Sequence, residues 1–102
     1  MLDEDFLFEG PVIHWRGPAP FFFVAVPAEL VEAIRHAARS LSYGWGVVPV
    51  MARIGDAPLF GTSLFPRDGG YLLPLKDVVR RQAGVEPGDL VAISMQLGKL
   101  KR

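Results

Sequence analysis

Apolar residues recur along this chain with two spacings, one typical of strands and one typical of helices. Residues 21–26, FFFVAV, are apolar at every position, which predicts a strand covered on both faces. In residues 90–97, LVAISMQL, apolar residues alternate with others, so the odd-numbered positions are expected to face the core. Residues 6–15 alternate in the same way around a glycine-proline pair, which predicts one bent strand or two short ones.

Two segments have the helical spacing instead. In residues 27–41 apolar side chains return every three or four positions behind an initial proline, which predicts a first helix. Residues 76–83, KDVVRRQA, end at Gly84, a residue that commonly terminates helices, and we expect Val78, Val79 and Ala83 to face inward.

Three more strands are expected in the middle of the chain, at residues 45–54, 58–65 and 71–75. The turn signals GDAP and PRDGG separate them, and a Pro-Gly turn precedes the last strand. About six short strands with two helices, and no regular alternation of strand and helix, favour a mainly β (α+β) fold. We predict a single domain over residues 1–102, a small closed and mostly antiparallel β-barrel.

Composition adds two expectations. Lys plus Arg and Asp plus Glu number 11 each, so the net charge of +0 gives no general attraction to nucleic acid. Hydrophobic residues make up 50% of the chain, a high share for a domain of this size. This surplus predicts a homodimer that buries part of residues 21–26.

The cellular compartment of the protein can be inferred from its cysteine content and its apolar stretches. The chain has no cysteine, its first residues are acidic, and prolines interrupt its most apolar stretch, residues 18–31. That stretch is also shorter than a membrane span. We therefore expect a cytoplasmic protein without a membrane segment.

One cluster of basic residues could bind a ligand. Lys76 and Arg80 are four apart on the second helix, and Arg67 on the PRDGG loop would join them if the hairpin folds over that helix. Such a patch suits phosphate, carboxylate or a nucleic-acid backbone. Trp45, between two glycines, is the candidate for an apolar wall beside it. The other interpretation is a solvated helix face whose charges are neutralised by nearby aspartates.

Catalytic and metal-binding patterns are weak. Thr62 and Ser63 lack the nucleophile-elbow pattern, and no spacing brings His14 or His36 close to them. The two histidines share no metal-ligand spacing, so we predict no catalytic residues, no metal site and no cofactor. Enzymatic activity stays open as the least favoured class.

The stretch GWGVVPVMARIGDAPLFGTSLFPRDGGYLLPLKDVVRRQAGVEPGDLVAI, residues 44–93, resembles the domain of unknown function 1905 family. The segment PFFFVAVPAELVEAIR is similar to that family's earlier strand and helix, so the resemblance covers nearly the whole chain. It implies a small closed β-barrel with helices, of a kind also found fused to other small bacterial domains. It implies no biochemical activity.

A narrower resemblance concerns residues 73–95, which are similar to AbrB-type swapped-hairpin transcription regulators in their order of strand, basic helix, Pro-Gly-Asp turn and strand. That resemblance implies a dimer that binds DNA.

Two functions are therefore open. The first is a non-catalytic binding module that takes a small anionic ligand or a protein partner through Trp45, Arg67, Lys76 and Arg80. The alternative is a nucleic-acid-binding regulator that acts as a dimer.

Overall fold

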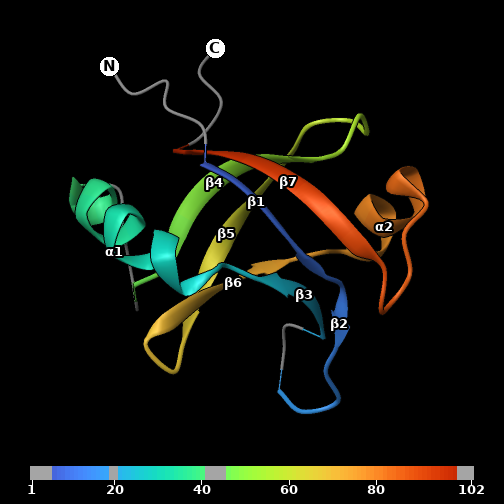
Figure 1. The fold of residues 1–102 in the computed structure, drawn as a ribbon, viewed down its shortest axis with the longest axis horizontal. Helices are drawn as coiled ribbons and strands as arrows, with labels where there is room; N and C mark the ends of the chain where they lie inside the picture. The colour runs from blue at the N-terminus through green and yellow to red at the C-terminus, as the bar shows by residue number, and fades with distance from the viewer. Residues whose placement is uncertain (1–5, 19–20, 41–45, 99–102) are drawn as a thin grey trace.

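The computed structural model describes residues 6–18, 21–40 and 46–98. Within them lie seven strands, two α-helices and one 3-10 turn (Figure 1). The elements in chain order are β1 (Phe6–Pro11), β2 (Ile13–His14), β3 (Phe22–Ala25), α1 (Ala28–Ala37), η1 (Ala38–Ser40), β4 (Val48–Ile54), β5 (Phe60–Arg67), β6 (Gly70–Pro74), α2 (Asp77–Ala83) and β7 (Leu90–Leu97).

The strands form one sheet in the order β1-β7-β4-β5-β6-β3-β2, and every neighbouring pair is antiparallel. The sheet curls so that β1 approaches β3, which makes a near-closed barrel (Figure 1). At this seam a Cβ on Gly10 would lie 3.0 Å from Val24 Cγ1, so glycine allows the two strands to come together. The predicted mainly β, antiparallel barrel with two helices is confirmed.

The inside of the barrel is filled by alternate residues of the strands. In β7, Val91, Ile93 and Met95 are buried and Leu97 packs partly buried against the same core. Phe6 and Phe8 of β1 are buried in the same alternating pattern. The faces predicted from the two-residue period are therefore confirmed for both strands.

The two helices lie on opposite sides of the barrel (Figure 1). Helix α1 buries Val31 and Ile34, and its Arg35 donates a hydrogen bond of 2.9 Å to the carbonyl oxygen of Gly69 in the β5–β6 turn. The predicted helix over 27–41 is observed as α1 followed by η1, and its last residue lies outside the described part. The hydrogen bond from Arg35 thus links α1 to the β5–β6 turn.

Helix α2 is shorter, and one predicted inward residue is wrong. Val79 and Ala83 pack half-buried against the core, whereas Val78 is 49% exposed. Consecutive residues of a helix point about 100° apart, and α2 turns Val79 and Ala83, which are four apart, toward the core and Val78 toward solvent. Gly84 ends α2 with a φ of 68°, as its predicted role at the helix end requires.

Strand β3 is covered on both faces only in its middle. Val24, at 0% exposed, faces the core, and the adjacent Phe23, at 6%, faces outward but is also buried. Phe23 lies opposite Pro74 in the β3–β6 pairing. Leu72 is also buried outside the main core, and it lies opposite Phe65 in the β5–β6 pairing. The barrel thus carries a second, smaller apolar layer on the outer face of β3, β6 and β5. The homodimer through residues 21–26 stays a prediction.

Candidate functional site

Two of the four residues predicted to bind a ligand, Lys76 and Arg80, line the same groove. This first groove has a volume of about 330 Å³ and lies where the beginning of β3 meets the end of β6 and the first turn of α2. The amide of Leu75 donates a hydrogen bond of 2.9 Å to the carbonyl oxygen of Phe22, which joins the two strands there. The first groove is lined by Phe21, Phe22, Pro74, Leu75, Lys76, Asp77 and Arg80.

The guanidinium group of Arg80 is held in the wall of the first groove. Its Cζ lies 3.6 Å from the centroid of the Phe22 ring, and its Nε donates a hydrogen bond of 3.2 Å to the carbonyl oxygen of Leu75. Its Nη2 lies 3.6 Å from Asp77 Oδ1, and the side chain is only 18% exposed. Arg80 therefore contributes a positive charge that protein contacts hold in place at its Nε and Nη2 atoms.

His14 completes this arrangement from the neighbouring strand β2. Its ring stacks on Phe22 with a centroid separation of 4.4 Å and an interplanar angle of 6°. Two groups this close to one ring would collide if they shared a face, so His14 and Arg80 lie on opposite faces of Phe22. Phe22 is thereby fixed between them, which makes this side of the first groove rigid.

Lys76 is placed differently. It is exposed, and no ion pair or hydrogen bond of its ammonium group is found within the described residues. A second groove of about 540 Å³, along β4 and β5, also includes Lys76 in its lining. That groove is lined by Pro49, Val50, Met51, Gly61, Thr62, Ser63, Pro74 and Lys76. Lys76 thus stands between two largely apolar grooves, which we call the Lys76 grooves.

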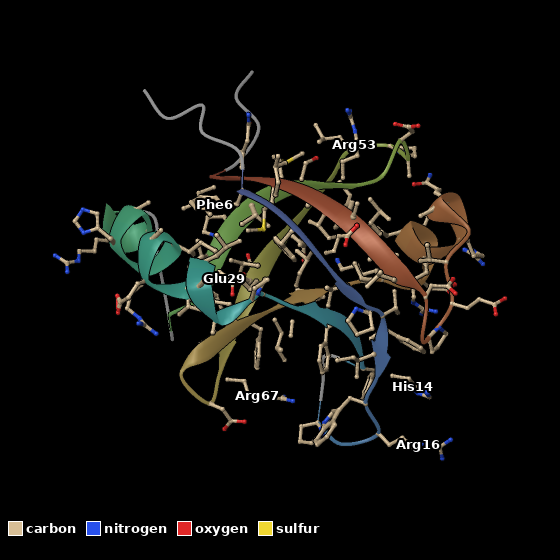
Figure 2. The ribbon with its side chains drawn as sticks, viewed as in Figure 1. Phe6, His14, Arg16, Glu29, Arg53 and Arg67 are labelled. Carbon is tan, nitrogen blue, oxygen red and sulfur yellow. The ribbon has the colours of Figure 1, made fainter. Side chains whose placement is uncertain are left out.

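Arg67 is not among the residues that line the Lys76 grooves. It ends β5, and its Cζ lies 5.5 Å from the centroid of the Trp15 ring and 5.8 Å from that of Phe65. The residues after it, Asp68 and Gly69, have φ values of 53° and 80°, which confirms the predicted hairpin turn. Figure 2 shows Arg67 at the same edge of the molecule as Arg16 and His14. Trp45, the predicted apolar wall, lies outside the described residues.

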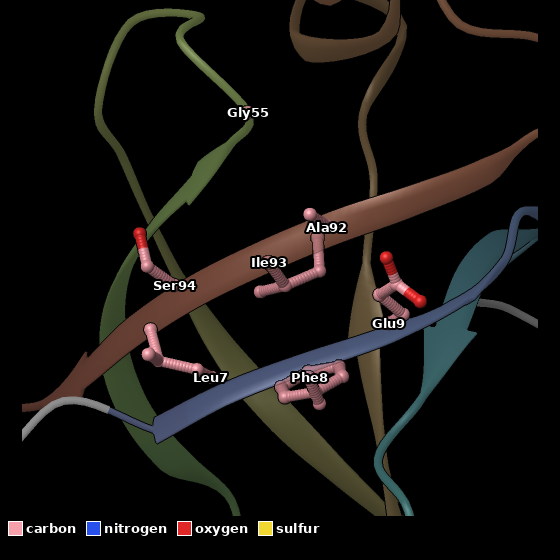
Figure 3. Close-up of a pocket in the computed structure, with 7 residues that line it drawn as sticks. All are labelled: Leu7, Phe8, Glu9, Gly55, Ala92, Ile93 and Ser94. Carbon is pink, nitrogen blue, oxygen red and sulfur yellow. The ribbon is translucent and has the colours of Figure 1, made fainter.

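Another groove, which the sequence analysis did not predict, lies on the outer face of β1 and β7 (Figure 3). It has a volume of about 480 Å³, and Figure 3 shows Ser94 and Glu9 toward its two ends, with Leu7 of β1 near Ser94. Leu7 is 68% exposed. An apolar residue at an outward position of a predicted strand was the feature of the sequence that could have indicated this groove. Its single charged lining residue is a carboxylate, so this groove does not suit an anion.

The residues considered for catalysis lie on different elements, His14 on β2, His36 on α1, and Thr62 and Ser63 on β5. His14 contacts Phe22, and Ser63 lies on β5 opposite Pro49 of β4. In the part of the chain that the structure describes, no charged or polar residue is buried, and no group of three or more His, Asp or Glu side chains is placed to hold a metal ion. None of the described helices has the length and apolar character needed to span a membrane.

Comparison with known families gives a match over most of the chain. The model of a family described as a domain of unknown function (DUF1905) matches residues 8–95. This range contains both helices and all strands except the first two residues of β1 and the last two of β7. A comparison with curated proteins finds no match.

Proposed function

The chain belongs to the DUF1905 family, and we propose that it is a non-catalytic binding module whose Lys76 grooves take a small anionic ligand. The family description carries no activity, so the proposal rests on geometry. Its main support is the position of Lys76, an exposed cation between two apolar grooves. A ligand with one anionic group and an apolar body matches this combination.

Each side of the first groove has a distinct role in this proposal. The Lys76 ammonium group is a compact charge with three donors, suited to a carboxylate or phosphate oxygen. The apolar part of the ligand would lie on Phe21 and Pro74. Asp77 already pairs with Arg80 at 3.6 Å and with Arg81 at 3.2 Å, which reduces its repulsion of an incoming anion.

The expected affinity is modest. One solvent-exposed ion pair contributes about 0.2–1 kcal/mol. Burial of about 100 Å² of apolar ligand surface would add roughly 2.5 kcal/mol. Because these contributions total only about 3 kcal/mol and association also costs translational freedom, we expect a Kd of about 10 mM or weaker for a small monoanion.

The test is a thermal-shift titration with phenyl phosphate and benzoate, beside neutral benzyl alcohol. At about ten times the Kd, bound ligand stabilises the protein by about 1.4 kcal/mol, which raises the Tm by about 6–11 °C for a domain of this size. Lys76→Met keeps the length of the side chain and removes its charge, so it should weaken the binding of the anions by up to about fivefold and leave the response to benzyl alcohol unchanged. Arg39→Met removes an exposed charge from η1 and should leave the response intact. An equal response in Lys76→Met, or no response to any anion, would refute the proposal.

The alternative function, a nucleic-acid-binding dimer, uses the same basic residues. The segment 73–95 has the expected order of strand, helix, turn and strand, with β6 and β7 in separate places in the sheet order. A short DNA duplex in the same titration tests this alternative. A nucleic-acid-binding regulator should be a dimer whose affinity for DNA falls steeply as the salt concentration rises. The small-ligand module predicts neither property.

A further inference from the structure

Outside the Lys76 grooves, a second surface combines exposed aromatic rings with an arginine. The guanidinium Cζ of Arg67 lies 5.5 Å from the Trp15 ring centroid and 5.8 Å from that of Phe65. Trp15 is 43% exposed and Phe65 is 37% exposed. We call Trp15, Phe65 and Arg67 the aromatic platform; it shares no residue with the lining of either Lys76 groove.

The Trp15 side chain is fixed in place by its own loop. A Cβ built on Gly17 would lie 2.5 Å from Trp15 Nε1 and 2.8 Å from Cε2, so the indole lies directly against the Gly17 backbone. The Trp15 amide also donates a hydrogen bond of 2.7 Å to the carbonyl oxygen of Phe21. Gly17 therefore acts as a positioning residue for an exposed ring.

The platform also has a rigid base. Phe65 lies opposite Leu72 in the β5–β6 pairing, and Leu72 and Phe23 form the buried apolar layer on this outer face. Rings that are held in place and still exposed lose little conformational entropy when a flat partner stacks on them. This favours binding through the ring faces.

Two arginines and one aspartate belong to the aromatic platform or directly adjoin it in the sequence. Arg67 is part of it, and Arg16, which is exposed, directly follows Trp15 in the chain (Figure 2). Asp68 follows Arg67 and belongs to the exposed hairpin turn. A ligand that matches both the rings and the cations must offer flat aromatic faces and negative charge together.

We infer that the aromatic platform binds single-stranded nucleic acid. One or two unpaired bases stack on Trp15 and Phe65 in place of the Arg67 guanidinium, which lies over both rings in the unbound structure. Arg67, displaced from the rings, and Arg16 contact the adjoining phosphates. A duplex does not expose its base faces, and an acidic peptide supplies the charge without regular stacking. Base stacking accepts every base, so the binding is expected to show little sequence preference.

The test uses labelled oligothymidylate and oligouridylate of about eight nucleotides, a length within the usual range for such surfaces. Fluorescence anisotropy gives the Kd, and a Trp45→Phe background leaves Trp15 as the single indole, whose emission should be quenched on binding. Trp15→Ala should weaken binding about 5- to 150-fold, the effect of losing one stacked base. Gly17→Ala should weaken it through displacement of the indole, and Trp15→Phe should retain most of the affinity.

Two controls separate this inference from a general loss of structure and from the proposed function. Leu7→Ala removes an equally apolar but more exposed side chain from β1 and should leave the Kd within about twofold. Lys76→Met should also leave it nearly unchanged, whereas it weakens the binding of small anions. Circular dichroism and the Tm of each variant establish that it is folded, and Phe65→Ala replaces Trp15→Ala if the latter is not.

The salt dependence supplies an independent readout. Contact with two phosphates of a single strand gives a slope of log K against log salt of about −1.4, much shallower than that of a duplex-binding protein. The inference is overturned if folded Trp15→Ala and Phe65→Ala variants bind the oligonucleotides as tightly as the parent. It is also overturned if duplex DNA binds more tightly than the single strand, or if neither oligonucleotide quenches Trp15.

Discussion

Replacement of Arg80 by alanine tests whether this residue mainly stabilises the fold or serves a ligand. The side chain covers one face of Phe22, donates to the carbonyl oxygen of Leu75 and is 18% exposed. Its neighbour Arg81 carries the same charge and shares the partner Asp77, at 3.2 Å, but is 71% exposed. The two arginines therefore form a matched pair that differs in burial.

The expected loss for Arg80→Ala follows from its contacts. A cation–π contact that is largely shielded from water contributes about 1–2 kcal/mol. The hydrogen bond from the charged Nε to Leu75 contributes about 1.5–3 kcal/mol if it is fully shielded, and less here. The ion pair with Asp77 adds little, because the carboxylate is 65% exposed. Since these contributions overlap, we expect the free energy of unfolding to fall by about 2–3 kcal/mol.

Urea denaturation of both variants, followed by circular dichroism, measures this difference. Arg81→Ala should change the free energy of unfolding by less than about 0.5 kcal/mol, as expected for an exposed ion pair. Arg80→Ala should lower the Tm by about 10–20 °C. A double-mutant cycle with Phe22→Leu should give a coupling energy of about 0.5–2 kcal/mol, which assigns part of the loss to the stacked pair.

One result would refute this reasoning. If Arg80→Ala is no more destabilising than Arg81→Ala and shows no coupling to Phe22, then the guanidinium is not held by the barrel. Its role would then be that of an ordinary surface cation available to a ligand.

The remaining predictions concern glycines. Gly10→Ala should lower the free energy of unfolding by about 1–2 kcal/mol in urea denaturation, because the new Cβ would lie 3.0 Å from Cγ1 of the fully buried Val24. Gly61→Ala should change it by less than about 0.5 kcal/mol, because its Cβ would meet the flexible Met51 side chain at 3.2 Å; equal effects of the two would contradict the closed seam. Gly84→Ala should lower the Tm by about 4–8 °C in a thermal scan, because an L side chain is strained at a φ of 68°; an unchanged Tm would contradict that conformation.

Much of the fold could be predicted from the sequence because it depends on local pattern. The two-residue period of β1 and β7 placed their core faces correctly, and Gly84 and the PRDGG turn took the conformations that their residues favour. The second helix shows the limit of this reasoning. Its apolar residues include the neighbours Val78 and Val79, and only packing against the barrel decides which of them is buried.

The candidate site could be predicted only in part. The spacing of Lys76 and Arg80 placed both on one side of α2, and both line the first groove. Arg67 was expected to join them if the hairpin folded over α2, and the hairpin carries it to Trp15 and Phe65 instead. The spacing of residues along a helix predicts which of them share a face of that helix. It does not predict where a hairpin from another part of the chain lies relative to the helix.

The sequence by itself thus determined which segments are strands and helices, where the chain turns and which strand faces are apolar. Strand order and register were decided only by the tertiary structure, and with them the stacking of Arg80 on Phe22 and the meeting of Arg67 with Trp15. The physical reason is that backbone conformation and periodicity act over a few residues, whereas the closure of a barrel brings together residues from distant segments.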